Sequence, residues 1–381
     1  MKRTRRAYLG TIGIAGLAGC TDVLGGEPDG DDQDVAIDQS GSEDTADDPT
    51  PSVAVTDSDR DSTPPTSDQS LPLPDDTETL SNSIVSGGVS QDGIPSIDDP
   101  NFLDANAADE WLDAGEPVFG IAIGDDVRAY PQRVLVWHEI VNDVIDGESL
   151  AITYCPLTGT AQAFERGSTE FGVSGRLLNS NLVMYDRETE SYWPQMLATA
   201  IRGEHEGTVL REIPLTWTTW NRWKSNYPET TVLSDDTAYV RDYDRDPYGS
   251  YNPRSGFYAD DSLLFSPYSD VDDSTFHIKD IVLGARSEDG AVAVSKESLL
   301  TDGLLQGTVG DIPYIAVANP TLATGYFYRN PDDVAIEYDD GEVIVDGDSS
   351  DPWDLPLERV LRYDAFWFAW AGYYPETEVM A

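Results

Sequence analysis

Short runs of hydrophobic and β-branched residues, separated by turns rich in Gly, Asp and Asn, recur along most of the chain. Such runs predict short β-strands, and the clearest are Val118–Ile123, Leu150–Tyr154, Thr160–Phe164, Phe171–Arg176 and Leu182–Asp186. Apolar residues at helical spacing after Pro131 predict a short helix that reaches Val141. Two further short helices are expected at Trp220–Tyr227 and Trp367–Tyr374, because a proline follows each. The pattern therefore predicts an α+β, strand-dominated fold.

The same pattern occurs twice. WNRWKSNYPETTV begins at Trp220 and WFAWAGYYPETEV begins at Trp367, an offset of 147 residues. VFGIAIGDDVRAYP begins at Val118 and VLGARSEDGAVAV begins at Val282, an offset of 164 residues. Self-similarity in the same order predicts two structural repeats. We expect a first repeat over 96–233, an Asp- and Tyr-rich insertion over 234–276 and a second repeat over 277–381, in a pseudo-two-fold arrangement.

The charge of the chain excludes some functions. There are 71 acidic and 23 basic residues, and the formal net charge is −48. A binder of nucleic acid through a basic patch is excluded, because a polyanion would be repelled; a polybasic membrane-binding stripe is excluded too. Asp supplies 49 of the acidic residues, and only 4 residues are Lys. This composition resembles that of proteins from extreme halophiles, since molar salt shortens the Debye length to ~3 Å and screens such self-repulsion.

The first twenty residues, MKRTRRAYLGTIGIAGLAGC, carry two export signals in order. Thr4-Arg5-Arg6-Ala7-Tyr8-Leu9 resembles a twin-arginine signal, and Leu17-Ala18-Gly19-Cys20 matches a lipobox. The sequence has no apolar run of ~18 residues that would span a bilayer. Residues 1–20 are therefore expected to be a signal peptide, with a lipid on Cys20 that holds the protein on the outer face of the cytoplasmic membrane.

The segment after Cys20 is acidic and lacks aromatic residues. From Thr21 to Leu80 it has 18 acidic residues and one basic residue, Arg60. A segment of this composition buries too little apolar surface to offset its ordering entropy. Residues 21–95 are therefore predicted to be a disordered tether.

Cys155 is the single cysteine left once Cys20 is lipidated, so it has no partner for an intramolecular disulfide. It lies at the end of a predicted strand, in Tyr-Cys-Pro-Leu-Thr-Gly-Thr. One hypothesis is a nucleophilic or redox thiol with a depressed pKa, to which Thr158 donates a hydrogen bond and which His138 and Arg176 tune. The other is a buried small hydrophobic residue, because free cysteines are often buried. The sequence leaves both open.

Metal sites are a further possibility. His138 and Cys155, with His277 or Met184, form a soft ligand set suited to copper, although no tight metal-binding spacing supports it. Glu139 or Asp143 is a candidate for orienting His138. The alternative is that His138 has a structural role. In the insertion, Asp242, Asp244 and Asp246 alternate and give weak candidates for a Ca²⁺ site, while the distal Glu of a complete loop signature is missing.

The stretches RAYPQRVLVWHEIVND, ITYCPLTGTAQAF, FGVSGRLLNSNLVMYDRETESYW, DYDRDPYGSY and WFAWAGYYPETEV resemble the domain-of-unknown-function family 3179. The resemblance covers nearly all of the folded part and implies no established reaction. Many members have Cys-Pro-Leu-Cys where this chain has Thr158 as the fourth residue, which implies thiol redox chemistry but leaves no resolving cysteine here. The family-like polar positions are Arg176, Asn179, Asn181, Asp186 and Arg187, and the last four, together with Glu139, are taken as candidate ligand-binding residues. For Arg176, binding of an anion is an alternative to stabilising the Cys155 thiolate.

Three functions stay open at this point. The first is a cell-surface oxidoreductase that uses Cys155 alone. The second is a non-catalytic module that binds a small ligand or an envelope partner. The third is a carrier of copper or another metal that uses Cys155 and His138. The sequence identifies no cofactor, substrate or electron donor.

Overall fold

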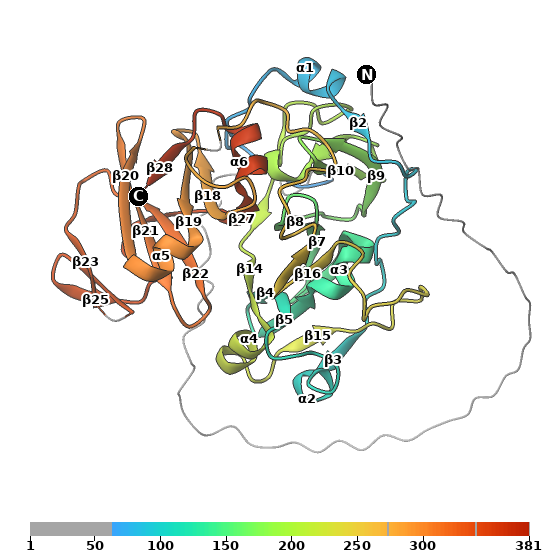
Figure 1. Cartoon of the computed structure of the whole chain (residues 1–381), viewed down its shortest axis with the longest axis horizontal. Coiled ribbons are helices and arrows are strands. Elements are labelled where there is room, and N and C mark those ends of the chain that lie inside the picture. Colours follow the sequence, from blue (N-terminus) through green and yellow to red (C-terminus); the bar gives the residue numbers. More distant parts are fainter. Residues whose placement is uncertain (1–62, 273, 340, 381) are drawn as a thin grey trace, which may run out of the picture. The chain divides into compact units, whose positions relative to one another are not determined.

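Short strands, most of them paired antiparallel, are the main secondary structure of the folded chain, as the sequence pattern predicted (Figure 1). The computed structural model describes residues 63–272, 274–339 and 341–380, all of which belong to one compact unit. Every helix is short, so the fold is α+β and strand-dominated. In these ranges, no helix has the length and apolar character needed to cross a bilayer. The expected signal peptide and Cys20 lie outside the described residues.

Two sheets form the first half of the folded region. Their strand orders are β14-β4-β5-β15-β3 and β13-β8-β7-β6. The strands are β3 (Phe102–Asp104), β4 (Pro117–Ile123), β5 (Asp126–Pro131), β6 (Ile140–Ile145), β7 (Glu148–Cys155), β8 (Thr160–Glu165), β13 (Glu212–Ile213), β14 (Thr216–Thr219) and β15 (Thr231–Leu233). The helices of this half are α2 (Ala105–Ala108), α3 (Gln132–His138) and α4 (Trp220–Asn226).

The second half repeats this order. Its sheets are β27-β18-β19-β28 and β20-β21-β22-β26. The strands are β18 (Ile281–Ser287), β19 (Gly290–Ser295), β20 (Leu304–Val309), β21 (Ile312–Asn319), β22 (Thr324–Arg329), β26 (Glu358–Val360), β27 (Arg362–Phe366) and β28 (Glu378–Met380), and the helices are α5 (Lys296–Asp302) and α6 (Trp367–Tyr373). The last strand of each half pairs in parallel with a strand that precedes a helix: β15 pairs with β5, which precedes α3, and β28 pairs with β19, which precedes α5.

The packing of tryptophan against glycine is also repeated, at the offsets of 147 and 164 residues seen in the sequence. A Cβ added at Gly120 of β4 would lie 2.3 Å from the ring of Trp223, and one added at Gly284 of β18 would lie 2.3 Å from the ring of Trp370. Each tryptophan therefore packs directly on a strand backbone that only glycine leaves open. The symmetry relation between the two halves stays a prediction.

Smaller sheets extend each half. In the first half, β11-β10-β9-β2 form a sheet and β1 pairs with β12. In the second half, β23-β24-β25 form a sheet, and β16 and β17 make a hairpin inside the insertion. The bounds are β1 (Thr66–Ser67), β2 (Val85–Ser86), β9 (Phe171–Leu178), β10 (Asn181–Asp186), β11 (Tyr192–Pro194), β12 (Val209–Leu210), β16 (Gly249–Tyr251), β17 (Arg254–Gly256), β23 (Ile336–Asp339), β24 (Glu342–Val345) and β25 (Asp348–Ser350), with helix α1 (Thr77–Asn82) and the 3₁₀ turn η1 (Gln195–Leu197).

Two boundaries differ from the sequence-based expectation. The helix expected to reach Val141 ends at His138, because Glu139 adopts left-handed backbone geometry and β6 starts immediately afterwards. The tether predicted for 21–95 is wrong from residue 63 onwards. There, β1 pairs with β12, and Leu71 and Leu80 are buried in a core cluster that also contains Trp193 and Trp370. Two leucines in an acidic segment gave no periodic signal that would predict this packing.

Candidate functional site

Cys155 ends β7 with a side chain that is 1% exposed. Its Sγ lies 3.8 Å from the carbonyl oxygen of Ser180. Burial raises the pKa of the thiol to about 11, and negative charge on nearby Glu139 acts in the same direction. Hydrogen bonds from Thr158 favour the thiolate but do not reverse the shift. The depressed thiol pKa expected of a reactive cysteine is therefore wrong, and Arg176 is not among the groups that act on it.

His138 is also buried, and its hydrogen bonds go to residues other than Cys155. Its Nδ1 lies 2.8 Å from the carbonyl oxygen of Pro95, and its Nε2 lies 2.7 Å from the hydroxyl oxygen of Tyr243. Burial lowers the pKa of His138 to about 4, so the ring is neutral at neutral pH. Among the described residues, no hydrogen bond joins His138 to Cys155, and no group of three His, Cys, Asp or Glu side chains is arranged to hold a metal ion. The geometry does not support a copper site here.

Glu139 occupies a position that favours glycine. It caps helix α3 with φ 59° and ψ −27°, in the left-handed region. The equivalent residue, 164 positions later, is Gly303, which caps α5 with φ 82°. The hydrogen bonds around the two caps correspond: Glu139 N donates to the Leu135 carbonyl at 2.7 Å, and Gly303 N donates to the Leu299 carbonyl at 2.8 Å. A non-glycine residue in this geometry is strained, and such strain is often found at functional sites.

The side chain of Glu139 lines a cavity of about 380 Å³, which we call the Glu139 cavity. Its walls are mainly apolar and come from β9, β10, the strand-end turn after Cys155, the segment after β2 and the insertion. The lining residues are Gly87, Val89, Ile94, Glu139, Leu157, Val173, Gly175, Arg176, Leu177, Leu182, Tyr248, Leu264 and Phe265. Cys155 is not among the lining residues.

Desolvation raises the pKa of Glu139 to about 8. No described residue forms a hydrogen bond or ion pair with its carboxyl group. The nearby phenol of Tyr248 has a raised pKa, caused by burial and then by the charges of Glu139 and Cys155. At neutral pH, Glu139 is therefore a protonated acid that faces an apolar cavity, which is a group able to donate a hydrogen bond or a proton.

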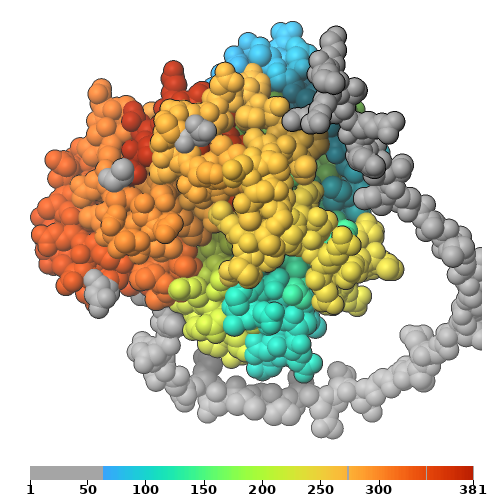
Figure 2. All heavy atoms as spheres, in the orientation of Figure 1, coloured from blue at the N-terminus to red at the C-terminus, as the bar shows by residue number. Residues whose placement is uncertain are grey.

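The insertion 234–276 closes one side of the Glu139 cavity through Tyr248, Leu264 and Phe265. Figure 2 shows this segment as the yellow to gold atoms over the face in view. Asp246 fixes it in place, because its Oδ2 accepts hydrogen bonds from Gln132 Nε2 and from the Tyr258 hydroxyl, each at 2.9 Å.

The anchoring of Asp246 bears on the Ca²⁺ prediction. Asp244, by contrast, is 94% exposed and lies 3.6 Å from Arg133. Asp242 makes only a backbone contact, its carbonyl accepting from Arg245 N. The three carboxylates do not converge, and the described residues contain no acidic group of three that would hold a cation. The proposed Ca²⁺ loop is therefore corrected to an anchored loop.

The four family-like residues that were taken as candidate ligand-binding residues form hydrogen bonds or ion pairs within the fold. Asn179 Nδ2 donates to the carbonyl of Ala369 at 2.7 Å, which ties β9 to α6. Asn181 Nδ2 donates to Thr158 Oγ1 and to Gln195 Oε1. Asp186 accepts hydrogen bonds from Thr189 and Trp193, and Arg187 forms ion pairs with Asp98 and Glu170. None of the four lines the Glu139 cavity, so their assignment as ligand-binding residues stays a prediction without support from this site.

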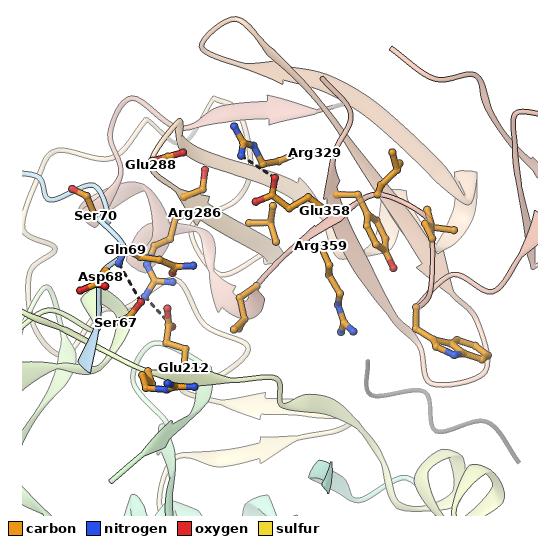
Figure 3. Close-up of a pocket in the computed structure, with 18 of the residues that line it drawn as sticks. Ser67, Asp68, Gln69, Ser70, Glu212, Arg286, Glu288, Arg329, Glu358 and Arg359 are labelled. Atoms are coloured by element: carbon orange, nitrogen blue, oxygen red, sulfur yellow. Dashed lines mark hydrogen bonds and ion pairs between the residues drawn. The ribbon is translucent and has the colours of Figure 1, made fainter. Parts of the chain in front are cut away.

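A second cavity, of about 500 Å³, is lined by residues of both halves and by residues 67–70 (Figure 3). Three of its arginines have acidic partners: Arg211 with Glu165 at 3.1 Å, Arg286 with Glu212 at 3.0 Å, and Arg329 with Glu358 at 2.9 Å. The first and third pairs occupy equivalent strands of the two halves with their charges exchanged. Of the three pairs, Arg286–Glu212 joins the two halves, and we assign no ligand to this cavity.

Sequence reasoning named Glu139 and Arg176 but not the cavity that joins them. Tyr248 and Leu264 were missed, because they reach the cavity from an insertion more than 60 residues away in the chain. One signal was available: the offset of 164 aligns Glu139 with Gly303, which marks a glycine-type position that carries a carboxylate.

Comparison with known proteins agrees with the resemblance seen in the sequence. Residues 91–377 match the family described as "Protein of unknown function (DUF3179)". No match was found among curated proteins or among solved structures.

Proposed function

Because the chain belongs to the family of proteins of unknown function DUF3179, which implies no reaction, we propose its function from the Glu139 cavity. The protein is a binding module for a small, mainly apolar molecule that carries a hydrogen-bond acceptor. Export by the twin-arginine route and a lipid on Cys20 place this module on the outer face of the cytoplasmic membrane; that part of the proposal rests on the sequence alone.

One observation carries the proposal. Glu139 has a protonated carboxyl group without a described partner, in an apolar cavity, at a backbone position where the other half has glycine. The left-handed geometry costs about 1–2 kcal/mol, and desolvation of the carboxyl group, which raises its pKa, adds a further cost at neutral pH. A ligand whose acceptor forms a hydrogen bond with the Glu139 carboxyl group would offset these costs. The volume and apolar walls suit a small organic molecule.

A matched pair of probes tests this proposal. Acetophenone carries a carbonyl acceptor, and α-methylstyrene has nearly the same shape without it. We expect acetophenone to bind about tenfold more tightly at pH 7, since a hydrogen bond to the acid contributes roughly 1–1.5 kcal/mol. Above pH 8, Glu139 ionises and loses its proton, so the preference should disappear. Titration calorimetry in molar salt measures both dissociation constants.

The variant Glu139→Gln is the control for the role of the proton. Its amide still donates a hydrogen bond but does not ionise, so the preference for acetophenone should persist from pH 7 to pH 9. Equal binding of the two probes by the unaltered protein, or a preference that does not respond to pH, would refute the proposal.

The burial of Cys155 gives a prediction that separates binding from thiol chemistry. In Cys20→Ser protein, Cys155 is the only thiol. A rise of its pKa to about 11 leaves roughly one hundredth of the usual thiolate at pH 8. We therefore expect alkylation by iodoacetamide to be at least ~100-fold slower in the folded protein than in denaturant. Fast labelling of the folded protein at pH 8 would restore the oxidoreductase hypothesis.

A further inference from the structure

Arg176 lies at the Glu139 cavity and is the one exposed residue of β9. A β-bulge causes this exposure. Val183 of β10 pairs with Arg176, but Met184 pairs with Val173, so Ser174 and Gly175 have no opposite residue on β10. Gly175 has φ 72°, and Arg176 N donates to Ser174 Oγ at 3.1 Å. Bulges change the direction of a side chain at the edge of a site, and this one turns a guanidinium outwards in an otherwise buried strand.

The guanidinium of Arg176 has no acidic partner among the described residues. Arg187, just beyond β10, shows the contrast, since it lies 2.8 Å from Asp98 and also pairs with Glu170. Arg202, Arg241 and Arg245 also have no acidic partner among the described residues, but of these four arginines it is Arg176 that lines the Glu139 cavity. Arginine is the side chain best suited to bind a planar carboxylate, because its N–H groups match both oxygens.

The remaining lining of the cavity opening is apolar. Val89 is 40% exposed and Leu264 is 58% exposed, and both line the Glu139 cavity. Exposed aliphatic side chains next to an unpaired cation match a molecule with an apolar body and an anionic group. Together with the protonated Glu139, the cavity offers one positive charge, apolar walls and one neutral donor.

We propose that the ligand of the Glu139 cavity is an ionised apolar carboxylic acid, whose carboxylate pairs with Arg176 while its apolar body fills the cavity. This inference rests on the proposed function and names the class of ligand. Arg176 acts as a binding residue, and Glu139 contacts a second, neutral acceptor on the same molecule.

Two aryl ketones that differ in one group test the inference. Butyrophenone is neutral, and 3-benzoylpropionate carries a carboxylate on a similar chain. In the unaltered protein we expect 3-benzoylpropionate to bind about tenfold more tightly than butyrophenone, as one charge-assisted contact allows. In Arg176→Gln protein this difference should vanish, because the carboxylate of 3-benzoylpropionate loses its charged partner. Arg202→Gln is the matched control, because Arg202 is also exposed and contacts only the ring of Tyr192.

The outcomes separate this inference from the proposed function. If both ketones bind the unaltered protein equally, or if the preference for the carboxylate survives in Arg176→Gln protein, the anionic ligand is refuted and ketone binding still stands. If neither ketone binds, the proposed function fails together with the inference. Loss of the preference in Arg202→Gln protein would show a general effect of charge and would also overturn it.

Discussion

Replacing Glu139 with glycine is expected to stabilise the fold and to abolish the preference for carbonyl probes. Glycine adopts φ 59° without strain, which contributes about 1–2 kcal/mol. At pH 7 the variant also no longer carries an acid whose pKa rises from 4.5 to about 8 on folding. We therefore expect the free energy of unfolding to rise by roughly 3–5 kcal/mol, measured by denaturant titration in molar salt.

The direction in which stability changes with pH follows from whether the folded or the unfolded chain keeps the proton of Glu139. Between pH 4.5 and pH 8 the unfolded chain releases the proton of Glu139 and the folded chain keeps it, so this group lowers stability as the pH rises. The stabilisation by Glu139→Gly should therefore grow over this range. Ala323→Gly is the control, because Ala323 has φ 51° in the second half and no titratable group; its gain should be independent of pH. A destabilised Glu139→Gly protein would contradict the account.

Alanine at Gly284 is expected to destabilise the fold by about 3 kcal/mol, because its Cβ would lie 2.3 Å from the ring of Trp370. The same substitution at Gly120, against Trp223, should cost a similar amount, since the two contacts are equivalent. Thermal unfolding measures both effects.

Two further variants check the cause of that loss. Gly115→Ala is the matched control, because its nearest neighbour, Asn252 Nδ2, is 3.4 Å from the added Cβ; we expect a change below about 0.5 kcal/mol. Trp370→Leu combined with Gly284→Ala should cost less than the two single effects added together, because the smaller side chain makes room for the Cβ. A Gly284→Ala protein as stable as the unaltered chain would show that the tryptophan does not pack as described.

The repeat and the strand pattern made much of the fold predictable. The helices after Trp220 and Trp367 appear where the sequence placed them, since paired tryptophans followed by Tyr-Pro mark the same element twice. The α3 boundary was missed because only the backbone at Glu139 ends the helix there, and glutamate is a poor signal of left-handed geometry.

The candidate site was less predictable. Glu139, Arg176 and Cys155 were singled out individually, but burial decides their chemistry. Cys155 was weighed as a thiolate, yet it is buried and desolvated and does not line the cavity. The wall formed by Tyr248 and Leu264 depends on how the insertion folds back, which depends on Asp246 reaching Gln132. Contacts between residues so far apart in the chain are not predicted by local sequence patterns.

The state of the Glu139 carboxyl group at neutral pH is the basis of the whole account. Infrared difference spectra between the unaltered protein and Glu139→Gln protein, recorded as a function of pH, report its protonated C=O band directly. The account predicts that this band is present at pH 7 and disappears with a midpoint near pH 8. A midpoint near the unperturbed value of 4.5 would mean an ionised, solvated glutamate, and would refute the proposed binding function.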